Sequence, residues 1–186
     1  LALAAVEILQ EQIPVAGENI HAGLANVIWP GRLQLITRGS GRKILLDGAH
    51  NPAGARTLGE TLKKIFPAEK PTLILGVLQD KDWRHICETL ASQAVRIHTV
   101  PVASERSANP AELAEACRKM NPSAEIVAGN SLADALDKSA GDGFVIITGS
   151  LYLVGEALEL LGLSPAGRAE RGLNEWTSPP PVLLPG

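Results

Sequence analysis

Strand-like and helix-like segments alternate across most of this chain, and this alternation constrains the fold more than any other feature. Apolar runs typical of buried strands occupy residues 33–37, 43–47, 72–78, 95–102, 125–128 and 143–149. Apolar residues recur at helical spacing in residues 52–65, 82–93, 110–120, 131–139 and 151–161. Strands separated by helices run parallel, are joined by right-handed crossovers and form a sheet that is covered on both faces.

The first two strands are the exception, because only a short Gly-Ser-Gly turn lies between residues 33–37 and 43–47. A connection this short joins antiparallel neighbours. The predicted fold class is therefore α/β: a Rossmann-like, mostly parallel six-stranded sheet with one antiparallel strand from an N-terminal hairpin, and helices on both faces.

Three parts of the chain differ in pattern. Residues 1–30 carry two helical segments that end at a turn, Trp29-Pro30-Gly31, and we interpret them as the last helices of a preceding domain plus a hinge. Residues 31–162 are the predicted α/β domain. Residues 163–186 are rich in proline and show no periodicity, so we expect a mobile tail.

Composition excludes several classes of function. The 17 basic and 20 acidic residues leave a formal net charge of −3 without a basic run, so nucleic acid is not an expected partner. No apolar stretch approaches the ~20 residues of a membrane-spanning helix, and no signal segment opens the chain, so we expect a soluble, cytoplasmic protein. Cys87 and Cys117 fall on predicted apolar helix faces, which favours buried free thiols over a disulfide or a metal site.

The candidate site lies in the loops that follow the strands, because open parallel sheets bind ligands beyond the carboxyl ends of their strands. The first such loop holds Asp47 and His50 before a helix whose free N–H groups favour a phosphate or carboxylate. The hinge and the later loops add Arg32, Lys81, Arg106 and Ser150. Polar residues collect in the loops of any α/β domain, and only the joint pattern of cations, histidine and hydroxyl suits an anionic ligand.

Five motifs give a more specific indication: WPGRLQ (29–34), ILLDGAHNP (44–52), GVLQDKDW (76–83), ERSANP (105–110) and TGSLYLVGE (148–156). In this order and spacing, the chain resembles the C-terminal domain of the folylpolyglutamate synthase/dihydrofolate synthase family, within the Mur ligase superfamily. The resemblance spans roughly residues 18–162, and its DGAHNP and PGR elements are specific in combination.

This resemblance implies a reaction and its cofactors. Such ligases use ATP and Mg²⁺ to turn a carboxylate of dihydropteroate or a folate into an acyl phosphate, which the amine of L-glutamate attacks. It also implies that residues 1–30 end a central ATPase domain carrying the phosphate loop and most Mg²⁺ ligands, so no metal site is expected in this chain. The sequence has no Gly-x-x-x-x-Gly-Lys-Ser/Thr phosphate loop, so the chain alone should be inactive.

The resemblance also assigns roles to individual residues. Arg32 and His50 are the catalytic candidates; Arg32 would reach the ATP phosphates from the hinge, and Asp47 would contact the nucleotide ribose or fix the hinge. The incoming glutamate would be held by His50, Lys81 and Ser150, with Arg106 as a further substrate contact. Two alternatives stay open at this point: a Mur-type ligase domain for another amino acid, and a non-catalytic α/β module that binds a nucleotide or a small anion.

Overall fold

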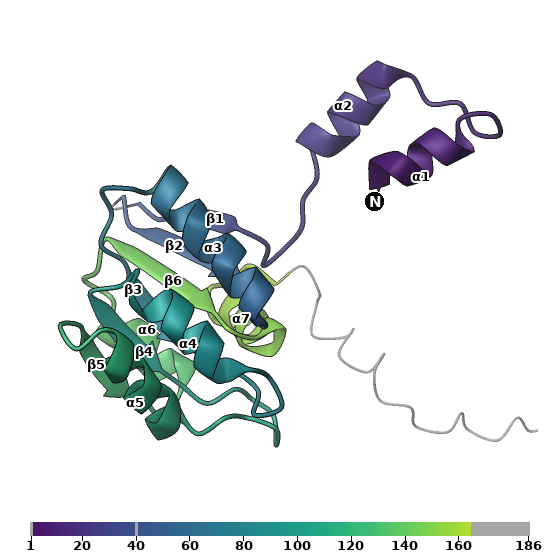
Figure 1. The fold of residues 1–186 in the computed structure, drawn as a ribbon. Coiled ribbons are helices and arrows are strands. Elements are labelled where there is room, and N and C mark those ends of the chain that lie inside the picture. The colour runs from purple at the N-terminus through teal and green to yellow at the C-terminus, as the bar shows by residue number, and fades with distance from the viewer. Residues whose placement is uncertain (1, 40, 165–186) are drawn as a thin grey trace, which may run out of the picture. The chain divides into compact units, whose positions relative to one another are not determined.

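A computed structural model describes residues 2–39 and 41–164 of the chain (Figure 1). The chain divides into two compact units at the bond between Pro30 and Gly31. The first unit, Leu1–Pro30, holds α1 (Ala2–Leu9) and α2 (Gly17–Ala25), and neither helix has a buried residue. Within the described ranges, no helix is long and apolar enough to cross a membrane. Most of the predicted tail, residues 165–186, lies outside the described residues.

The second unit is built on one six-stranded sheet with the strand order β1-β2-β6-β3-β4-β5. The strands are β1 (Gln34–Thr37), β2 (Lys43–Asp47), β3 (Thr72–Leu75), β4 (Arg96–Thr99), β5 (Glu125–Ala128) and β6 (Phe144–Thr148). β1 pairs with β2 antiparallel, and all the other neighbouring pairs in this sheet are parallel. The predicted fold class is confirmed.

Helices cover both faces of this sheet (Figure 1). One face carries α3 (Pro52–Ile65), α4 (Trp83–Ala91) and α5 (Pro110–Met120), and the other carries α6 (Leu132–Lys138) and α7 (Leu151–Leu160). Neighbouring strand residues point to opposite faces, so Leu45 packs in the first layer while Ile44 and Leu46 pack in the second. This double burial explains why the strands are apolar at almost every position.

The strands end earlier at the carboxyl edge than the apolar runs suggest. β3 ends at Leu75 and β4 at Thr99, although the sequence predicted strands over 72–78 and 95–102. Pro101 has no N–H to continue the β4 ladder. The chain after β3 turns instead to the loop after β4, where the Ala108 N–H donates to the Val77 carbonyl at 2.9 Å. The segments that follow β3 and β4 therefore form loops at this edge.

The two cysteines are buried and free, as predicted. Cys87 on α4 and Cys117 on α5 belong to the same apolar cluster. The hydrogen bond with Cys117, followed by burial, raises the pKa of the Cys87 thiol far above its usual range. Cys87 is therefore an inert core side chain.

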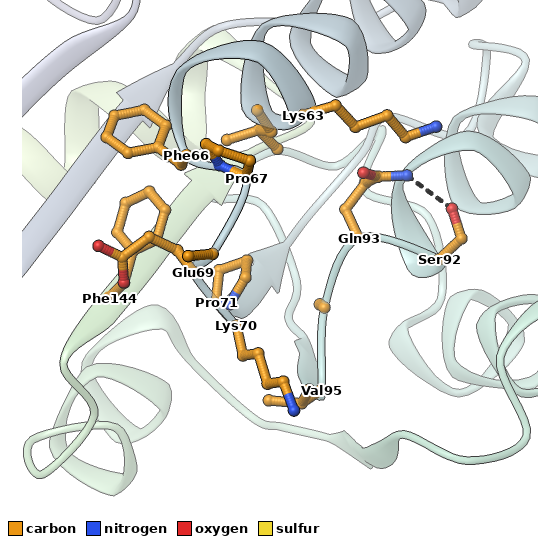
Figure 2. A pocket seen from close by; sticks show the side chains of 13 residues that line it. Lys63, Phe66, Pro67, Glu69, Lys70, Pro71, Ser92, Gln93, Val95 and Phe144 are labelled. Atoms are coloured by element: carbon orange, nitrogen blue, oxygen red, sulfur yellow. Dashed lines mark hydrogen bonds between the residues drawn. The ribbon is translucent and has the colours of Figure 1, made fainter.

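A hollow of about 520 Å³ lies at the amino edge of the sheet (Figure 2). Phe144 begins β6, and the lining residues Pro71 and Val95 immediately precede β3 and β4. Figure 2 shows the Phe66 and Phe144 rings next to each other on one side of the hollow, and their centroids are 4.9 Å apart. This hollow is at the edge opposite the loops in which the sequence predicted a site.

His98 on β4 is a buried polar side chain without a hydrogen-bond partner for either ring nitrogen among the described residues. Burial, followed by the charges of Arg96 and Lys138, lowers the pKa of His98, while Asp142 and Glu125 oppose this shift. A histidine in an unfolded chain has a pKa of about 6.5. Just below that pH the unfolded chain binds more protons than the folded one. The contribution of His98 to the free energy of unfolding is therefore fully present above about pH 6.5 and is lost as the pH falls.

We expect the free energy of unfolding of this chain to decrease between about pH 7 and pH 5, and His98→Leu to remove part of that decrease. Urea unfolding at several pH values measures both effects. His21→Gln, which replaces an exposed histidine of α2, is the control that keeps the pH dependence. An unchanged slope in His98→Leu would assign the pH dependence to other groups.

Candidate functional site at the carboxyl edge of the sheet

Backbone hydrogen bonds tie the strand-end loops together at the carboxyl edge. The Gly149 N–H donates to the Ala49 carbonyl at 3.0 Å, which joins the loop after β6 to the loop after β2. The Gly76 N–H donates to the Thr148 carbonyl at 3.2 Å and brings in the chain after β3. A bridge between Leu78 and Ser107 adds the loop after β4. Residues 47–51, 76–82, 104–108 and 148–152 thus form one connected border, which we call the rim.

Asp47 ends β2 and turns its carboxylate into the protein, where it is only 8% exposed. One carboxylate oxygen accepts from the Leu33 N–H at 2.9 Å, and the other accepts from the Ala49 N–H at 2.9 Å. Asp47 therefore fixes the turn that places Arg32 beside residues 47–51, which we call the first rim loop. The two roles that the resemblance implies for Asp47, fixing the hinge or contacting a nucleotide ribose, both stay predictions.

The turn held by Asp47 has an unusual backbone. Gly31 has φ 71°, and Leu33 has φ 45°, a conformation that is rare for a side chain of its size. The Gln34 side-chain oxygen accepts from the Gly31 N–H at 2.8 Å. Because two side chains hold this turn from opposite ends, its strained conformation is imposed by the surrounding structure.

Arg32 and His50 both contact the Gly48 carbonyl on the first rim loop, at 3.5 Å from Arg32 Nη1 and 2.8 Å from His50 Nδ1. A carbonyl can only accept, so Nδ1 of His50 carries a proton, and Nε2 is the acceptor in the neutral ring. A hollow of about 200 Å³ adjoins this loop and is lined by Arg32, Leu33, Asp47, Ala49, Gly54, Thr57 and Leu58. The structure thus brings the two catalytic candidates to one loop.

Ser150 lies in the rim but is only 2% exposed. Its Oγ accepts from the Tyr152 N–H at 3.2 Å and caps the start of α7. The Ser150 hydroxyl can still donate a hydrogen bond to another acceptor. Sequence reasoning did not foresee this capping role, and contact between Ser150 and a substrate stays a prediction.

Lys81 and Arg106 come from different loops and meet at Asp80. Arg106 Nη2 lies 2.7 Å and Lys81 Nζ 3.2 Å from the same carboxylate oxygen of Asp80. The hydrogen bond from Arg106 is the largest of the effects that lower the pKa of Asp80 to about 2, and burial opposes them. Sequence reasoning did not select Asp80, although an acid beside two cations predicted for one edge was a usable signal.

No group of three or more histidine, cysteine or acidic side chains in residues 2–39 and 41–164 could hold a metal ion. The two rim carboxylates described above are already engaged, Asp47 by backbone N–H groups and Asp80 by two cations. The described residues therefore do not form a metal site made of protein side chains alone.

Because Asp47 is buried and bonded to two N–H groups, Asp47→Ala should lower the free energy of unfolding of this chain by about 2 to 4 kcal/mol. Urea unfolding at neutral pH measures the loss. Asp137→Asn, at an exposed position of α6, is the control and should change it by less than about 0.5 kcal/mol. An equally small effect of Asp47→Ala would mean that the turn is held without this carboxylate.

Residues 31–151 match the family described as "Mur ligase, glutamate ligase domain". The chain is 34% identical to the folylpolyglutamate synthase of Lacticaseibacillus casei over 154 residues, which cover 82% of this chain and 34% of that protein. It is 30% identical to the dihydrofolate synthase/folylpolyglutamate synthase of Bacillus subtilis over 155 residues, covering 83% of this chain and 36% of that protein. The predicted resemblance is confirmed, and the chain spans about a third of these relatives.

The chain is also similar to solved structures from other organisms. Escherichia coli FolC in complex with DHPP and ADP matches with a TM-score of 0.76 at 26% identity, over 87% of this chain and 37% of that one. Mycobacterium tuberculosis folylpolyglutamate synthase with ADP and AMPPCP matches with a TM-score of 0.74 at 32% identity, over 89% and 39%. The Yersinia pestis bifunctional synthase with AMPPNP and Mn ion matches with a TM-score of 0.72 at 26% identity, over 87% and 38%.

Proposed function

Since this chain belongs to the Mur ligase family through its glutamate ligase domain, we propose that it is the C-terminal part of an ATP-dependent amide ligase. The enzyme adds L-glutamate to dihydropteroate or to a folate through an acyl phosphate, and this chain alone is inactive. The observation that carries the proposal is the agreement between the family match over 31–151 and relatives named folylpolyglutamate synthase and dihydrofolate synthase/folylpolyglutamate synthase.

The reaction has two steps. A carboxylate oxygen of the folate substrate attacks the γ-phosphorus of ATP, and ADP leaves; the amine nitrogen of glutamate then attacks the acyl carbon, and phosphate leaves with the C–O bond electrons. The amine must lose a proton in the second step, and His50 Nε2 is the acceptor that the Gly48 contact leaves available. Arg32, fixed at the first rim loop, balances charge on the phosphoryl group as it transfers.

The substrate carboxylates require cations that are held in place. Lys81 and Arg106 supply two of them on neighbouring rim loops, and Ser150 supplies a hydroxyl at the start of α7. Arginine offers a planar fork and lysine a point charge, so together they suit an acidic amino acid.

In this proposal, the complete enzyme uses ATP and a divalent metal ion. The similar structures are named for ADP, an ATP analogue and a manganese ion. The described residues of this chain hold no group of three or more metal-binding side chains, and the proposal places the metal ligands mainly in the preceding domain.

The preceding ATPase domain is the proposed partner of Leu1–Pro30. Helices α1 and α2 have no buried residue, and this unit exposes large apolar side chains, including Ile8 (78%), Val27 (65%) and Ile28 (90%). Large apolar side chains left exposed in such number indicate a surface that packs against another part of a protein. Closure between the domains would exclude water from the acyl phosphate.

The test uses the full-length protein that contains this chain. With Mg²⁺ and ATP, ADP release should depend on both L-glutamate and dihydropteroate or a reduced folate, while residues 1–186 alone should release none. Turnover with a different amino acid would favour another Mur-type ligase. Tight, Mg²⁺-independent nucleotide binding by the isolated chain, measured by calorimetry, would favour a non-catalytic module.

A further inference from the structure

Asp80 joins the two cations proposed for the substrate carboxylate. One oxygen of its carboxylate accepts from Arg106 at 2.7 Å and lies 3.2 Å from Lys81 Nζ. The two cationic nitrogens therefore lie no more than about 6 Å apart, because both distances meet at the same atom. Two positive charges this close repel each other, and long side chains in water separate unless an anion lies between them.

The backbone beneath these side chains is already fixed. The Gln79 N–H donates to the Arg106 carbonyl at 2.7 Å, and the Lys81 N–H donates to the Leu78 carbonyl at 3.1 Å. Ser104 Oγ accepts from the Arg106 N–H at 3.2 Å. Asp80 is therefore not needed to hold the two loops together, and what it controls is the direction of the Arg106 and Lys81 side chains.

Stability does not account for this cluster. The side chains of Asp80, Lys81 and Arg106 are 42%, 35% and 53% exposed, and ion pairs this exposed contribute little to folding. The cluster lies in the rim, and the hydrogen bond from the Gly76 N–H to the Thr148 carbonyl joins its first loop to the loop that carries Ser150. A charged group placed among rim side chains at little benefit to folding is better explained by ligand binding.

We propose that Asp80 is a positioning residue, which holds Arg106 beside Lys81 so that both cations meet one carboxylate of the acidic amino-acid substrate. This inference rests on the proposed function and adds a residue to its site. Two cations and one fixed anion leave the cluster with one net positive charge, which complements a single carboxylate. Asp80 acts through its neighbours and does not contact the reacting atoms.

The test is steady-state kinetics of the full-length enzyme with L-glutamate as the varied substrate. Asp80→Asn should raise the KM for glutamate about fivefold to tenfold, with kcat and the KM for ATP changed less than about twofold. Asp80→Glu retains the charge and should restore most of the affinity.

A double-mutant cycle separates positioning from a general effect on the loop. Arg106→Gln should raise the KM for glutamate, and the Asp80→Asn/Arg106→Gln variant should not be worse than Arg106→Gln alone, because Asp80 then has no guanidinium to hold. The urea midpoint of Asp80→Asn should equal that of the unsubstituted protein.

Each other outcome overturns the inference. A lower KM in Asp80→Asn would mean that Asp80 competes with the substrate for the cations, and an unchanged KM would mean that it has no part in binding. Both leave glutamate-dependent turnover, and therefore the proposed function, intact. Absence of such turnover in the unsubstituted enzyme would overturn the proposed function and this inference with it.

Discussion

Arg32→Ala in the full-length enzyme is expected to lower kcat by about 100-fold or more, with a smaller change in the KM for glutamate. The backbone on either side of Arg32 is held by Asp47 and Gln34, and its guanidinium lies against the first rim loop. A cation held in this way loses little entropy when charge develops on the phosphoryl group, which is why its removal affects the transition state most.

Measurement of kcat and of kcat/KM for ATP tests this expectation, and Arg38→Ala is the matched control. Arg38 follows β1 and donates to the Leu161 carbonyl, and it lies at the amino edge because β1 runs against β2. Its loss should change kcat less than about twofold, since it lies at the edge of the sheet opposite the rim. Arg32→Lys should recover only part of the rate, because lysine keeps the charge but not the planar fork. A normal kcat in Arg32→Ala would exclude Arg32 from the chemistry.

Gly149→Ala is expected to lower the free energy of unfolding of this chain by more than about 3 kcal/mol. Gly149 has φ 105°, where a residue with a side chain is strained, and an added Cβ would lie 2.5 Å from the Gly76 carbonyl oxygen. The Gly76 oxygen cannot move away cheaply, because it belongs to the backbone that joins β3 to β6 at the rim, and the Gly149 backbone is held by its own hydrogen bond to Ala49.

Urea unfolding of the purified chain measures this loss, and Gly155→Ala is the matched control. Gly155 lies inside α7, and an added Cβ would meet nothing within 4 Å. Alanine there should stabilise the chain by about 0.5 to 1 kcal/mol, because it reduces the freedom of the unfolded backbone in a helix. The two substitutions are chemically identical, so equal effects would show that the tight junction at Gly149 does not exist.

Local sequence pattern was sufficient for the elements of this fold. Double burial makes strands such as Phe144–Thr148 apolar throughout, and a turn of a few residues between β1 and β2 permits only a hairpin. The strand order was not predictable in this way. β6 lies between β2 and β3, and this position depends on pairing between segments about 100 residues apart, which no local pattern encodes.

The same limit applies to the site. The rule that ligands lie beyond the carboxyl ends of parallel strands predicted which loops to consider. It did not predict that the Asp47 carboxylate turns inward to backbone N–H groups, or that Ser150 is buried as a helix cap. The sequence placed Asp80 beside Lys81 at this edge, but its pairing with Arg106, 26 positions away, is set by the folded loops.

The hollow beside Phe66 and Phe144 has a practical consequence for inhibitor discovery. At about 520 Å³ it is the size of many small-molecule sites, but it lies at the edge of the sheet opposite the rim. A compound that binds there stabilises the folded chain by mass action and raises its melting temperature. A thermal-shift screen of this domain would therefore also detect any compound bound in this hollow, so its hits should be tested for competition with L-glutamate before they are pursued as inhibitors.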